Sequence, residues 1–440
     1  MNVAYLDPAY SLHFHRVAAC VAQRSGGTSV ALLSSAAYRM YTAGDRSFVW
    51  PPGRSTREIA MPAEFARAEW APAQGSPAAE VFAHAVEWLI ERFRSERIAL
   101  CLVFSDARPF SQAARIAAQR AGVVCLYFER GAFRLATSSL STQGLNARFS
   151  LVRAREQVGI AGMAADAPLR ARPTEPWLRL RFACFVARNL IARAASGERR
   201  LIQHKSYEAG HYARLAWVQW RAALRHRRRD PGELAALGGR PLVIVALQLP
   251  ADSQFALYSP FATNRQFVDF VAAGVRAVAP DAMLLFKRHP MDVAHDALPA
   301  GARWVEGNLA RFDAARPIVV CINSTVGFES LVRGLRVICF APSFYADAPA
   351  LVQASRENFV ERLGAVIAGD GDPVAGTLLR ADVLRWYQAP GDSYAYTQDD
   401  VEATAAIALE HFRASVTGPV GSGPDATRSF TDVRAVGPVR

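Results

Sequence analysis

The chain has 440 residues, of which 51% are hydrophobic and 20% are charged, and this composition excludes a largely disordered chain. At this length two domains are expected. No stretch reaches the roughly 18 uncharged apolar residues of a membrane span, and no signal peptide is expected at the N-terminus. The 6 cysteines are scattered without a C-x-x-C pair, so we expect reduced, buried thiols of a cytoplasmic protein and no zinc site.

The positive charge is concentrated in one part of the sequence. The formal net charge is +12, and residues 1–240 contain 34 basic and 18 acidic residues, whereas residues 170–229 alone contain 15 and 3. All basic residues except Lys205 and Lys287 are arginines, and a guanidinium matches two phosphate oxygens at once. The location of this charge indicates an anionic partner.

Short apolar runs alternate with helical patterns along the first 160 residues. Strands are expected at 3–6, 29–33, 99–104 and 123–128, and helices at 12–23 and from Pro109 onward. This alternation is typical of parallel α/β layers. A basic, helical stretch from 168 to 239 follows, and Asp230-Pro231-Gly232 breaks the chain near its end.

A second α/β series starts at Pro241. Strands are expected at 242–247, 283–286, 318–322 and 336–340, and helices at 264–278 and 326–333. We therefore predict an α/β fold with two Rossmann-like domains that face a cleft. The predicted boundaries are 1–167 for the first domain, 168–239 for a basic helical insert, 240–412 for the second domain and 413–440 for a disordered tail.

Several common motifs are absent from the sequence. There is no G-x-G-x-x-G, no G-x-x-x-x-G-K-[ST], no G-x-S-x-G and no H-E-x-x-H. Dinucleotide-binding, P-loop, serine-hydrolase and zinc-protease chemistry therefore have no support. No metal ligand set and no cofactor are expected.

Three short polar groups follow expected strands of the second series, and in open α/β sheets ligands bind outside the carboxyl ends of the strands. The groups contain Gln248, Asp252, Ser253 and Gln254, then Lys287 and His289, then Asn323, Ser324, Thr325, Gly327 and Glu329. The third group opens a helix, whose free N–H groups and dipole favour an anion such as phosphate.

Each group also has a plain structural interpretation. Asn323 and Ser324 suit helix N-caps, which is the commoner role of such residues. His289 is most simply a structural histidine, and Asp252 a turn residue after Pro250. Three such groups at three strand ends of one sheet together favour one shared site for an anionic ligand.

The three polar groups, in their order along the chain, resemble motifs of the capsular-polysaccharide biosynthesis family of KpsS type. Members of this family include retaining β-Kdo glycosyltransferases. The patterns Q-x-P-x-D-S-Q, K-x-H-P and N-S-T-V-G stand at 248–254, 287–290 and 323–327. In the first domain, residues 104–109, 128–134 and 144–146 resemble F-G-D-x-R, F-E-x-G-Y-x-R-P and G-V-N. The chain departs from the family at 7–10, where a glycine-rich turn is usual, and at Phe133 and Leu135, where tyrosine and proline are usual.

The resemblance implies two Rossmann-like domains of glycosyltransferase type B, with CMP-Kdo as donor substrate in the second domain. Asp252 would be the nucleophile whose displacement gives retention, and His289 and Lys287 would stabilise the departing phosphate. The other residues expected to bind or orient the donor are Gln248, Ser253, Gln254, Asn323, Ser324, Thr325, Gly327 and Glu329.

The first domain would hold the acceptor. Glu129 is a candidate base for the acceptor hydroxyl, and a surface or capping carboxylate is the equally open alternative. We expect Asp106 and Arg108 to form an ion pair that shapes their loop, and contact with a ligand is the alternative. Arg134 and Asn146 complete the expected acceptor side of the cleft.

The basic stretch has two open interpretations. Between 177 and 193, apolar residues alternate with Arg179, Arg181, Arg188 and Arg193. Such a helix can lie on an anionic membrane leaflet or can be a core helix with solvated arginines. The basic run at 225–229 has no accompanying RNA-binding signature, so no nucleic-acid partner is expected.

The leading hypothesis is a retaining β-Kdo transferase of capsule polysaccharide biosynthesis. It would move Kdo from CMP-Kdo to a lysophosphatidylglycerol-type lipid or its Kdo linker, at the inner face of the cytoplasmic membrane. Other capsule assembly or export proteins are expected as further partners. Two alternatives stay open: a type-B transferase that uses another nucleotide sugar, and a non-catalytic partner in capsule assembly or export.

Overall fold

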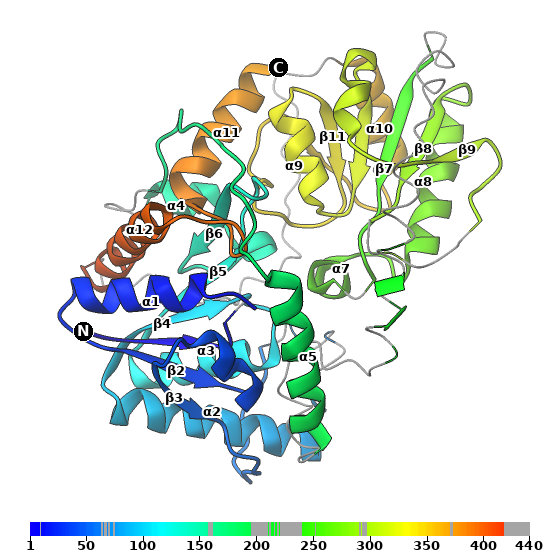
Figure 1. Cartoon of the computed structure of the whole chain (residues 1–440). Coiled ribbons are helices and arrows are strands. Elements are labelled where there is room, and N and C mark those ends of the chain that lie inside the picture. The colour runs from blue at the N-terminus through cyan, green and yellow to red at the C-terminus, as the bar shows by residue number, and fades with distance from the viewer. Residues whose placement is uncertain are drawn as a thin grey trace.

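The protein consists of two α/β units, each built on its own sheet (Figure 1). The computed structural model describes residues 1–417 except 9, 63–64, 66–67, 69–70, 74, 157–161, 195–209, 211–212, 215, 218–219, 221–239, 251, 290–291, 293–296 and 370–372. The predicted basic run at 225–229 and most of the predicted insert therefore lie outside the described residues.

The first sheet has seven strands in the order β13-β6-β5-β4-β1-β2-β3. Its strands are β1 (Asn2–Leu6), β2 (Ser29–Leu33), β3 (Arg46–Val49), β4 (Ile98–Phe104), β5 (Val124–Arg130), β6 (Thr137–Ser141) and β13 (Gln388–Pro390). β1 to β5 pair in parallel, and β6 and β13 continue the sheet with antiparallel pairings. The four strands predicted for this unit are confirmed.

Helices cover both faces of the first sheet. They are α1 (His13–Arg24), α2 (Pro77–Ser95), α3 (Pro109–Ala121) and α4 (Leu151–Glu156), with short 3-10 turns η1 (Ala36–Tyr41) and η3 (Asn146–Arg148). Alternate residues of β1 enter different cores: Ala4 and Leu6 pack on one face, and Val3 and Tyr5 on the other. This alternation is what a strand buried on both faces requires.

The second sheet has six strands in the order β12-β11-β10-β7-β8-β9, and every pairing is parallel. Its strands are β7 (Leu242–Ala246), β8 (Met283–Lys287), β9 (Ala302–Val305), β10 (Ile318–Cys321), β11 (Arg336–Cys339) and β12 (Leu351–Gln353). Its helices are α7 (Ser253–Tyr258), α8 (Asn264–Val278), η7 (Leu309–Ala315), α9 (Thr325–Val332), α10 (Phe359–Ala368) and α11 (Pro373–Tyr387). The predicted pair of Rossmann-like units is thus confirmed.

Each sheet reverses its strand order at one point. In the first sheet the chain runs from β1 outward to β3 and then returns to place β4 on the other side of β1. In the second sheet it runs from β7 to β9 and then places β10 on the other side of β7. A crevice forms at the carboxyl ends of the strands flanking such a reversal, and it is the usual ligand site of the fold.

The end of the described chain returns to the first unit. β13 pairs with β6, and α12 (Gln398–Thr417) packs along α1 (Figure 1). The structure differs here from the predicted boundaries, which assigned 388–412 to the second domain and began a tail at 413. The difference arises because the partners of β13 and α12 lie more than 240 residues earlier in the sequence, and only the folded chain brings them together.

Aromatic packing joins the two units. Tyr387, at the end of α11, stacks on Phe149 with 4.0 Å between ring centroids and lies 5.3 Å from the Phe344 ring. Phe133 of the first unit meets Phe328 of the second at 5.3 Å. These residues belong to one hydrophobic cluster that extends through both units. Apolar burial across the junction therefore fixes the units relative to each other.

Helix α5 (Leu178–Ala194) lies against the first unit (Figure 1). Its inner face places Phe182 and Phe185 on the ring of Tyr10, with centroids 5.2 and 5.0 Å away. Its outer face exposes large apolar side chains: Leu180 is 56% and Ile191 is 73% exposed. One face of the helix thus lies in the core and one face is open, and contact with a membrane leaflet stays a prediction.

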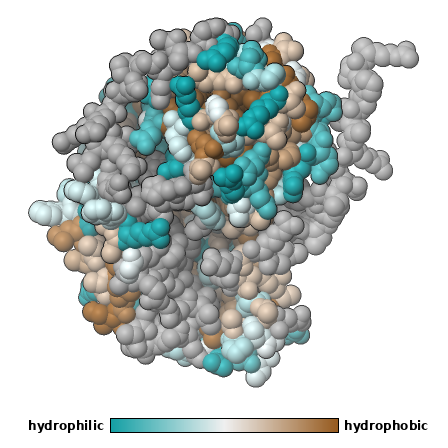
Figure 2. Space-filling view, turned by 90° about the vertical axis from the view of Figure 1, so that its right-hand side faces the viewer, coloured by the Kyte–Doolittle hydropathy of each residue, from teal (hydrophilic) through white to brown (hydrophobic). Residues whose placement is uncertain are grey.

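The surface mixes polar and apolar side chains. On the face shown in Figure 2, hydrophilic and hydrophobic residues are interspersed over the upper part of the molecule. None of the described helices is both long enough and apolar enough to span a bilayer. Cys184 on α5 is exposed, which differs from the predicted burial of the thiols, because it lies on the outer face of an amphipathic helix.

Candidate functional site

Three side-chain amides connect the loops after β7 and β10. Gln248 Nε2 donates to Asn323 Oδ1 at 3.0 Å, and the Asn323 backbone N–H donates to Gln248 Oε1 at 3.3 Å. Asn323 Nδ2 also donates to Gln254 Oε1 at 3.4 Å. The first and third predicted groups therefore meet at the strand-order reversal of the second sheet. Gln248 and Asn323 are buried, so their amides hold the two loops together.

Asp252 is the N-cap of α7. Its Oδ1 accepts a hydrogen bond from the Gln254 backbone N–H at 2.9 Å. Within the described part of the chain, no hydrogen bond is found at its second oxygen. The side chain is half-buried, as is that of Ser253, the first residue of the helix. A capping carboxylate with one engaged oxygen still presents the other oxygen to a ligand.

Ser324 is the N-cap of α9, which begins at Thr325. The Ser324 hydroxyl oxygen accepts from the Val326 N–H at 3.3 Å, and Tyr345 Oη donates to the Ser324 carbonyl at 2.6 Å. The capping interpretation thus describes one role of Ser324, whose O–H is left to donate. Both hydroxyl residues are half-buried at the helix N-terminus.

Gly327 has a packing role. A Cβ at this position would lie 2.6 Å from Tyr345 Oη and 2.8 Å from Cys321 Sγ. Only glycine lets α9 approach β10 this closely. The sequence analysis assigned Gly327 to phosphate binding, and the structure gives it a steric function in the helix that carries the hydroxyls.

Lys287 and His289 follow β8 on the same side of the sheet. The Lys287 ammonium group donates to the Gly307 carbonyl, and burial lowers the pKa of Lys287 while Glu329 opposes the shift. Burial also lowers the pKa of His289, against the negative charges of Asp252 and Asp292. A charge shifts a pKa in this way only at short range. The charge of Asp252 therefore reaches His289.

Glu329 of the second unit and Arg134 of the first unit shift each other's pKa through their charges. Burial lowers the pKa of the Arg134 guanidinium, which lies near Arg130, while Glu129 and Glu329 oppose the shift. Burial raises the pKa of Glu329, whereas Arg333, Arg134 and Lys287 lower it. The Glu329 side chain is nevertheless exposed at its surface.

Glu129 ends β5 in the first unit. Asn146 Nδ2 donates to its Oε2. Burial raises the pKa of Glu129 to about 7, Asp106 and Asp252 raise it as well, and Arg134 and Asn146 oppose them. Asp252 of the second unit thus lies close to Glu129 of the first. A carboxyl group with a pKa near neutrality can both take up and give back a proton.

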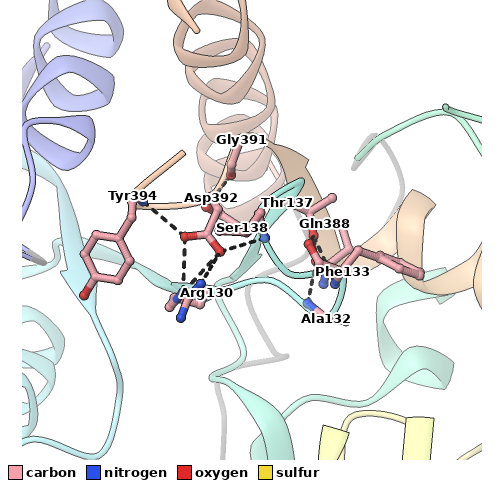
Figure 3. A network of polar contacts seen from close by, with 10 residues as sticks. Arg130, Ala132, Phe133, Thr137, Ser138, Gln388, Gly391, Asp392 and Tyr394 are labelled. Carbon is pink, nitrogen blue, oxygen red and sulfur yellow. Dashed lines mark hydrogen bonds and ion pairs between the residues drawn. The ribbon is translucent and has the colours of Figure 1, made fainter. Parts of the chain in front are cut away.

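Hydrogen bonds to Gln388 and Asp392, near the C-terminal end of the described chain, hold the loop that carries Arg134 (Figure 3). Asp392, which has no exposed surface, accepts two hydrogen bonds from Arg130 Nε at 3.2 and 3.1 Å and one from the Leu135 N–H at 3.2 Å. Gln388 Oε1 accepts from the Ala132 N–H at 3.0 Å. Residues of β13 and of the turn after it therefore fix the 131–135 loop. Asp392 and Gln388 were not predicted as site residues, because no local pattern in the sequence marks them.

The predicted Asp106–Arg108 ion pair is wrong. Asp106 Oδ2 lies 3.6 Å from Arg148 Nη1 and accepts from the Leu145 N–H at 2.8 Å. Arg108 instead lies over the Phe104 ring, 4.8 Å from its centroid. Ser105 has a φ of 64°, so the chain turns sharply here and the two side chains point to different neighbours.

Several of the predicted residues influence one another electrostatically across the two units. Asp252, His289, Lys287 and Glu329 come from the second unit, and Glu129 and Arg134 come from the first. The set combines a capped carboxylate, a carboxyl group that titrates near neutral pH, and several cationic or hydrogen-bonding groups. Such a set can bind an anion and exchange a proton beside it. Among the described residues there is no cluster of three or more His, Cys, Asp or Glu side chains suited to a metal ion.

Comparison with known proteins connects this site to a family. Residues 100–299 match the model of the family described as "Capsule polysaccharide biosynthesis protein". This confirms the resemblance predicted from the motifs. The match contains Glu129, Arg134, Asp252 and His289, and it ends before Asn323.

One curated relative matches over a short region. Protein FixF of Sinorhizobium fredii is 32% identical over 132 residues, which is 29% of this chain and 32% of FixF. The alignment thus spans about a third of the length of that relative.

Solved structures with a similar arrangement are more distant in sequence. The KpsC β-Kdo 2,7 transferase of Thermosulfurimonas dismutans is 16% identical, with a TM-score of 0.36 and coverage of 75% of this chain and 89% of that chain. The glycosyltransferase SnogD from Streptomyces nogalater is 14% identical, with a TM-score of 0.32 and coverage of 93% and 99%. Similarity at this level does not identify a substrate.

Proposed function

Because residues 100–299 match the model of the capsule polysaccharide biosynthesis family, we propose that this chain is a retaining glycosyltransferase that moves Kdo from CMP-Kdo to a growing capsule lipid end. The observation that carries the proposal is that the charge of Asp252 in the second unit helps to raise the pKa of Glu129 in the first. One carboxylate lies on the donor side and one on the acceptor side. A double displacement needs a nucleophile and a separate acid–base group in this relation.

The donor side binds and activates the nucleotide sugar. Asp252 attacks the anomeric carbon with its unengaged oxygen, and the bond from that carbon to the CMP phosphate breaks, with the electron pair leaving on CMP. Ser324 and Thr325 at the N-terminus of α9 donate hydrogen bonds to the leaving phosphate. His289 has a lowered pKa and acts as a neutral hydrogen-bond donor at pH 7, while Lys287 supplies positive charge.

The acceptor side completes the transfer. Glu129 takes the proton of the acceptor hydroxyl, whose oxygen attacks the anomeric carbon and displaces Asp252. Two inversions at the same carbon give net retention. Arg134 stands between Glu129 and Glu329, where it balances their charge. Gln248 and Asn323 act as positioning residues through their shared amide contacts.

We further propose that the outer face of α5 contacts an anionic lipid surface at the inner face of the cytoplasmic membrane, where a lipid acceptor would be found. Trp177 precedes the helix and is 73% exposed, and Leu180 and Ile191 are 56% and 73% exposed. Arg179 and Arg188 on the same helix are exposed too. Apolar side chains that enter the headgroup layer beside arginines favour an anionic bilayer.

The test is CMP release from CMP-Kdo by the purified chain in the presence of lysophosphatidylglycerol. Asp252→Asn is the informative variant, because asparagine retains an oxygen that can cap α7 and loses only the nucleophilic charge. We expect at least a roughly 10³-fold loss of CMP release in this variant. Asp269→Asn, on the exposed Arg265–Asp269 pair of α8, is the matched control and should keep full activity.

Other results would point to the alternatives. The capping roles of Asp252 and Ser324 favour a non-catalytic assembly or export partner that keeps the fold. That function predicts no CMP release by the wild-type chain. Release from a panel of other nucleotide sugars, but not from CMP-Kdo, would instead indicate a type-B transferase with a different donor.

A further inference from the structure

The first unit has a strand-end position of its own for a ligand, which the donor site does not use. It lies at the carboxyl ends of β1 and β4, where the strand order of the first sheet reverses. Asp7 follows β1, and Arg108 follows β4 as the N-cap residue of α3. Ligands occupy this position in open α/β sheets, and the donor site lies at the equivalent reversal of the second sheet.

Arg108 is buried there without hydrogen-bond partners. Its side chain belongs to a residue only 7% exposed, and among the described residues its Nε and Nη1 make no hydrogen bond. Buried guanidinium groups are normally paired, because an unpaired buried donor forfeits its contacts with water. In a guanidinium the Nε–H points to the Nη2 side and Nη1 lies on the Cδ side, so one anion can bind either of these unsatisfied nitrogens together with Nη2 as a fork.

The neighbouring carboxylate does not fill this role. Asp7 accepts from both the backbone N–H and the hydroxyl of Ser34. Burial raises the pKa of Asp7 to about 6, against those hydrogen bonds and the charge of Arg108. Asp7 is therefore near Arg108 but is held by Ser34, and it leaves the buried nitrogens of Arg108 unbonded.

Tyrosines gather near Arg108 in the first unit. Tyr10 stacks on Tyr38 with ring centroids 6.2 Å apart, and α5 covers this pair with Phe185. Tyr41 is fully buried, and among the described residues its Oη makes no hydrogen bond. Burial raises the pKa of Tyr394 to about 12, whereas Arg108 and Arg130 lower it. Neutral phenols beside an arginine suit a ligand that carries hydroxyl groups as well as one acid group.

Packing links the segment that carries Arg108 to the second unit. Ala107, next to Arg108, packs against Leu257 of α7, the helix that Asp252 caps. On the other side, Arg130 lies over the Tyr394 ring at 5.1 Å and is near Arg134. A ligand held at Arg108 can therefore extend toward Asp252 and Glu129 from the acceptor side.

We propose that Arg108 binds the acid group of the acceptor, a hydroxylated molecule with one carboxylate or phosphodiester, and that the tyrosines contact its hydroxyl groups. The assignment of this ligand as the acceptor rests on the proposed function, whereas the existence of the anion site does not. A sugar acid and a lipid headgroup could both supply the anion.

Binding measurements separate these sources. The probes are the methyl glycoside of Kdo, which carries a carboxylate, and glycerophosphoglycerol, which carries a phosphodiester without a lipid chain. Each is titrated into the full chain and into Arg108→Gln, Arg108→Lys and Arg120→Gln by calorimetry or ligand-observed NMR. Arg120 is exposed on the same helix α3, so its variant is the matched control.

We expect the wild type and Arg120→Gln to bind at least one probe equally well. Arg108→Gln should weaken this binding about tenfold or more, and Arg108→Lys should fall between, because lysine keeps the charge and loses the fork. The probe that binds identifies the source. The proposal is overturned if neither probe binds the wild type or if Arg108→Gln binds both as well as the wild type does.

Two further readouts keep the result interpretable. CMP binding should be unchanged in Arg108→Gln; absence of CMP binding to the wild type would count against the donor assignment and leave the anion site standing. The melting temperature of Arg108→Met should equal or exceed that of the wild type, because the variant removes an unpaired buried charge. A clear fall in melting temperature would show that Arg108 is a structural residue and would refute the proposal.

Discussion

The raised pKa of Glu129 makes a prediction about stability as well as chemistry. Its pKa rises from an ordinary value of 4.5 to about 7 on folding. Between these two pH values the folded chain keeps a proton that the unfolded chain has lost. The free energy of unfolding must therefore fall as the pH rises through this window. Glu129→Gln, which stays neutral at every pH, should not show this part of the fall.

The magnitude follows from the size of the shift. At about 1.4 kcal/mol per pKa unit, the loss caused by ionised Glu129 at pH 8 is at most about 3 kcal/mol. Relaxation of the site and entry of water reduce this value, so we expect about 1–2 kcal/mol. Glu129→Gln should thus be more stable than the wild type at pH 8 by about this amount and nearly equal to it at pH 5. The glutamine side chain in this variant can still accept the hydrogen bond from Asn146.

The assay is urea unfolding at pH 5, 6, 7 and 8 of the wild type, Glu129→Gln and the control Glu361→Gln. Glu361 is exposed on α10, and its variant should follow the wild type at each pH. A stability difference between Glu129→Gln and the wild type that does not change with pH would refute the reasoning. In transfer assays the same group acts as the base, so kcat/KM should rise with pH through about 7, and Glu129→Gln should lose roughly 10²–10⁴-fold.

Two other substitutions test the structural framework of the site. Gly327→Ala should lower the free energy of unfolding by about 1–3 kcal/mol, because the new Cβ would collide with the core under α9. The control is Gly364→Ala in α10, where the nearest side-chain atom is 3.7 Å from the new Cβ. In thermal unfolding this control should be neutral or stabilising. Asp392→Asn should lower the free energy of unfolding by about 1–3 kcal/mol and weaken acceptor use, because asparagine loses the negative charge that pairs with Arg130 and keeps only one accepting oxygen. The control Asp269→Asn, in the exposed Arg265–Asp269 pair, should change the melting temperature little. Equal effects of the two aspartate variants would contradict the view that Asp392 holds the 131–135 loop.

Local patterns in the sequence were sufficient to predict the helices and strands, and also the polar loops after β7, β8 and β10 of the second unit. The predicted helix at 264–278 coincides with α8, and the strand at 29–33 coincides with β2. Hydrophobic periodicity and an N-terminal proline or capping residue determine such elements over a few residues. The polar groups after β7, β8 and β10 could be placed together because parallel strands end at one edge of a sheet.

Long-range partners were not predictable in this way. Asp106 pairs with Arg148 and not with Arg108, and Arg130 pairs with Asp392, 262 residues further along the chain. The choice between such partners depends on which way each side chain points after a turn. A φ of 64° at Ser105 decides it for Asp106, and no pattern in the sequence announces that value.

The amino-acid sequence by itself determined the two α/β units, their strands and the three polar loops, because these depend on interactions between near neighbours along the chain. Only the tertiary structure decided that β13 and α12 return to the first sheet. It alone also brought the charge of Asp252 within reach of Glu129. The tertiary structure further buried the guanidinium of Arg108, whose Nε and Nη1 make no hydrogen bond among the described residues. Burial and charge proximity arise when distant segments pack together, and these two quantities set the pKa values and the unsatisfied donors on which the chemistry depends.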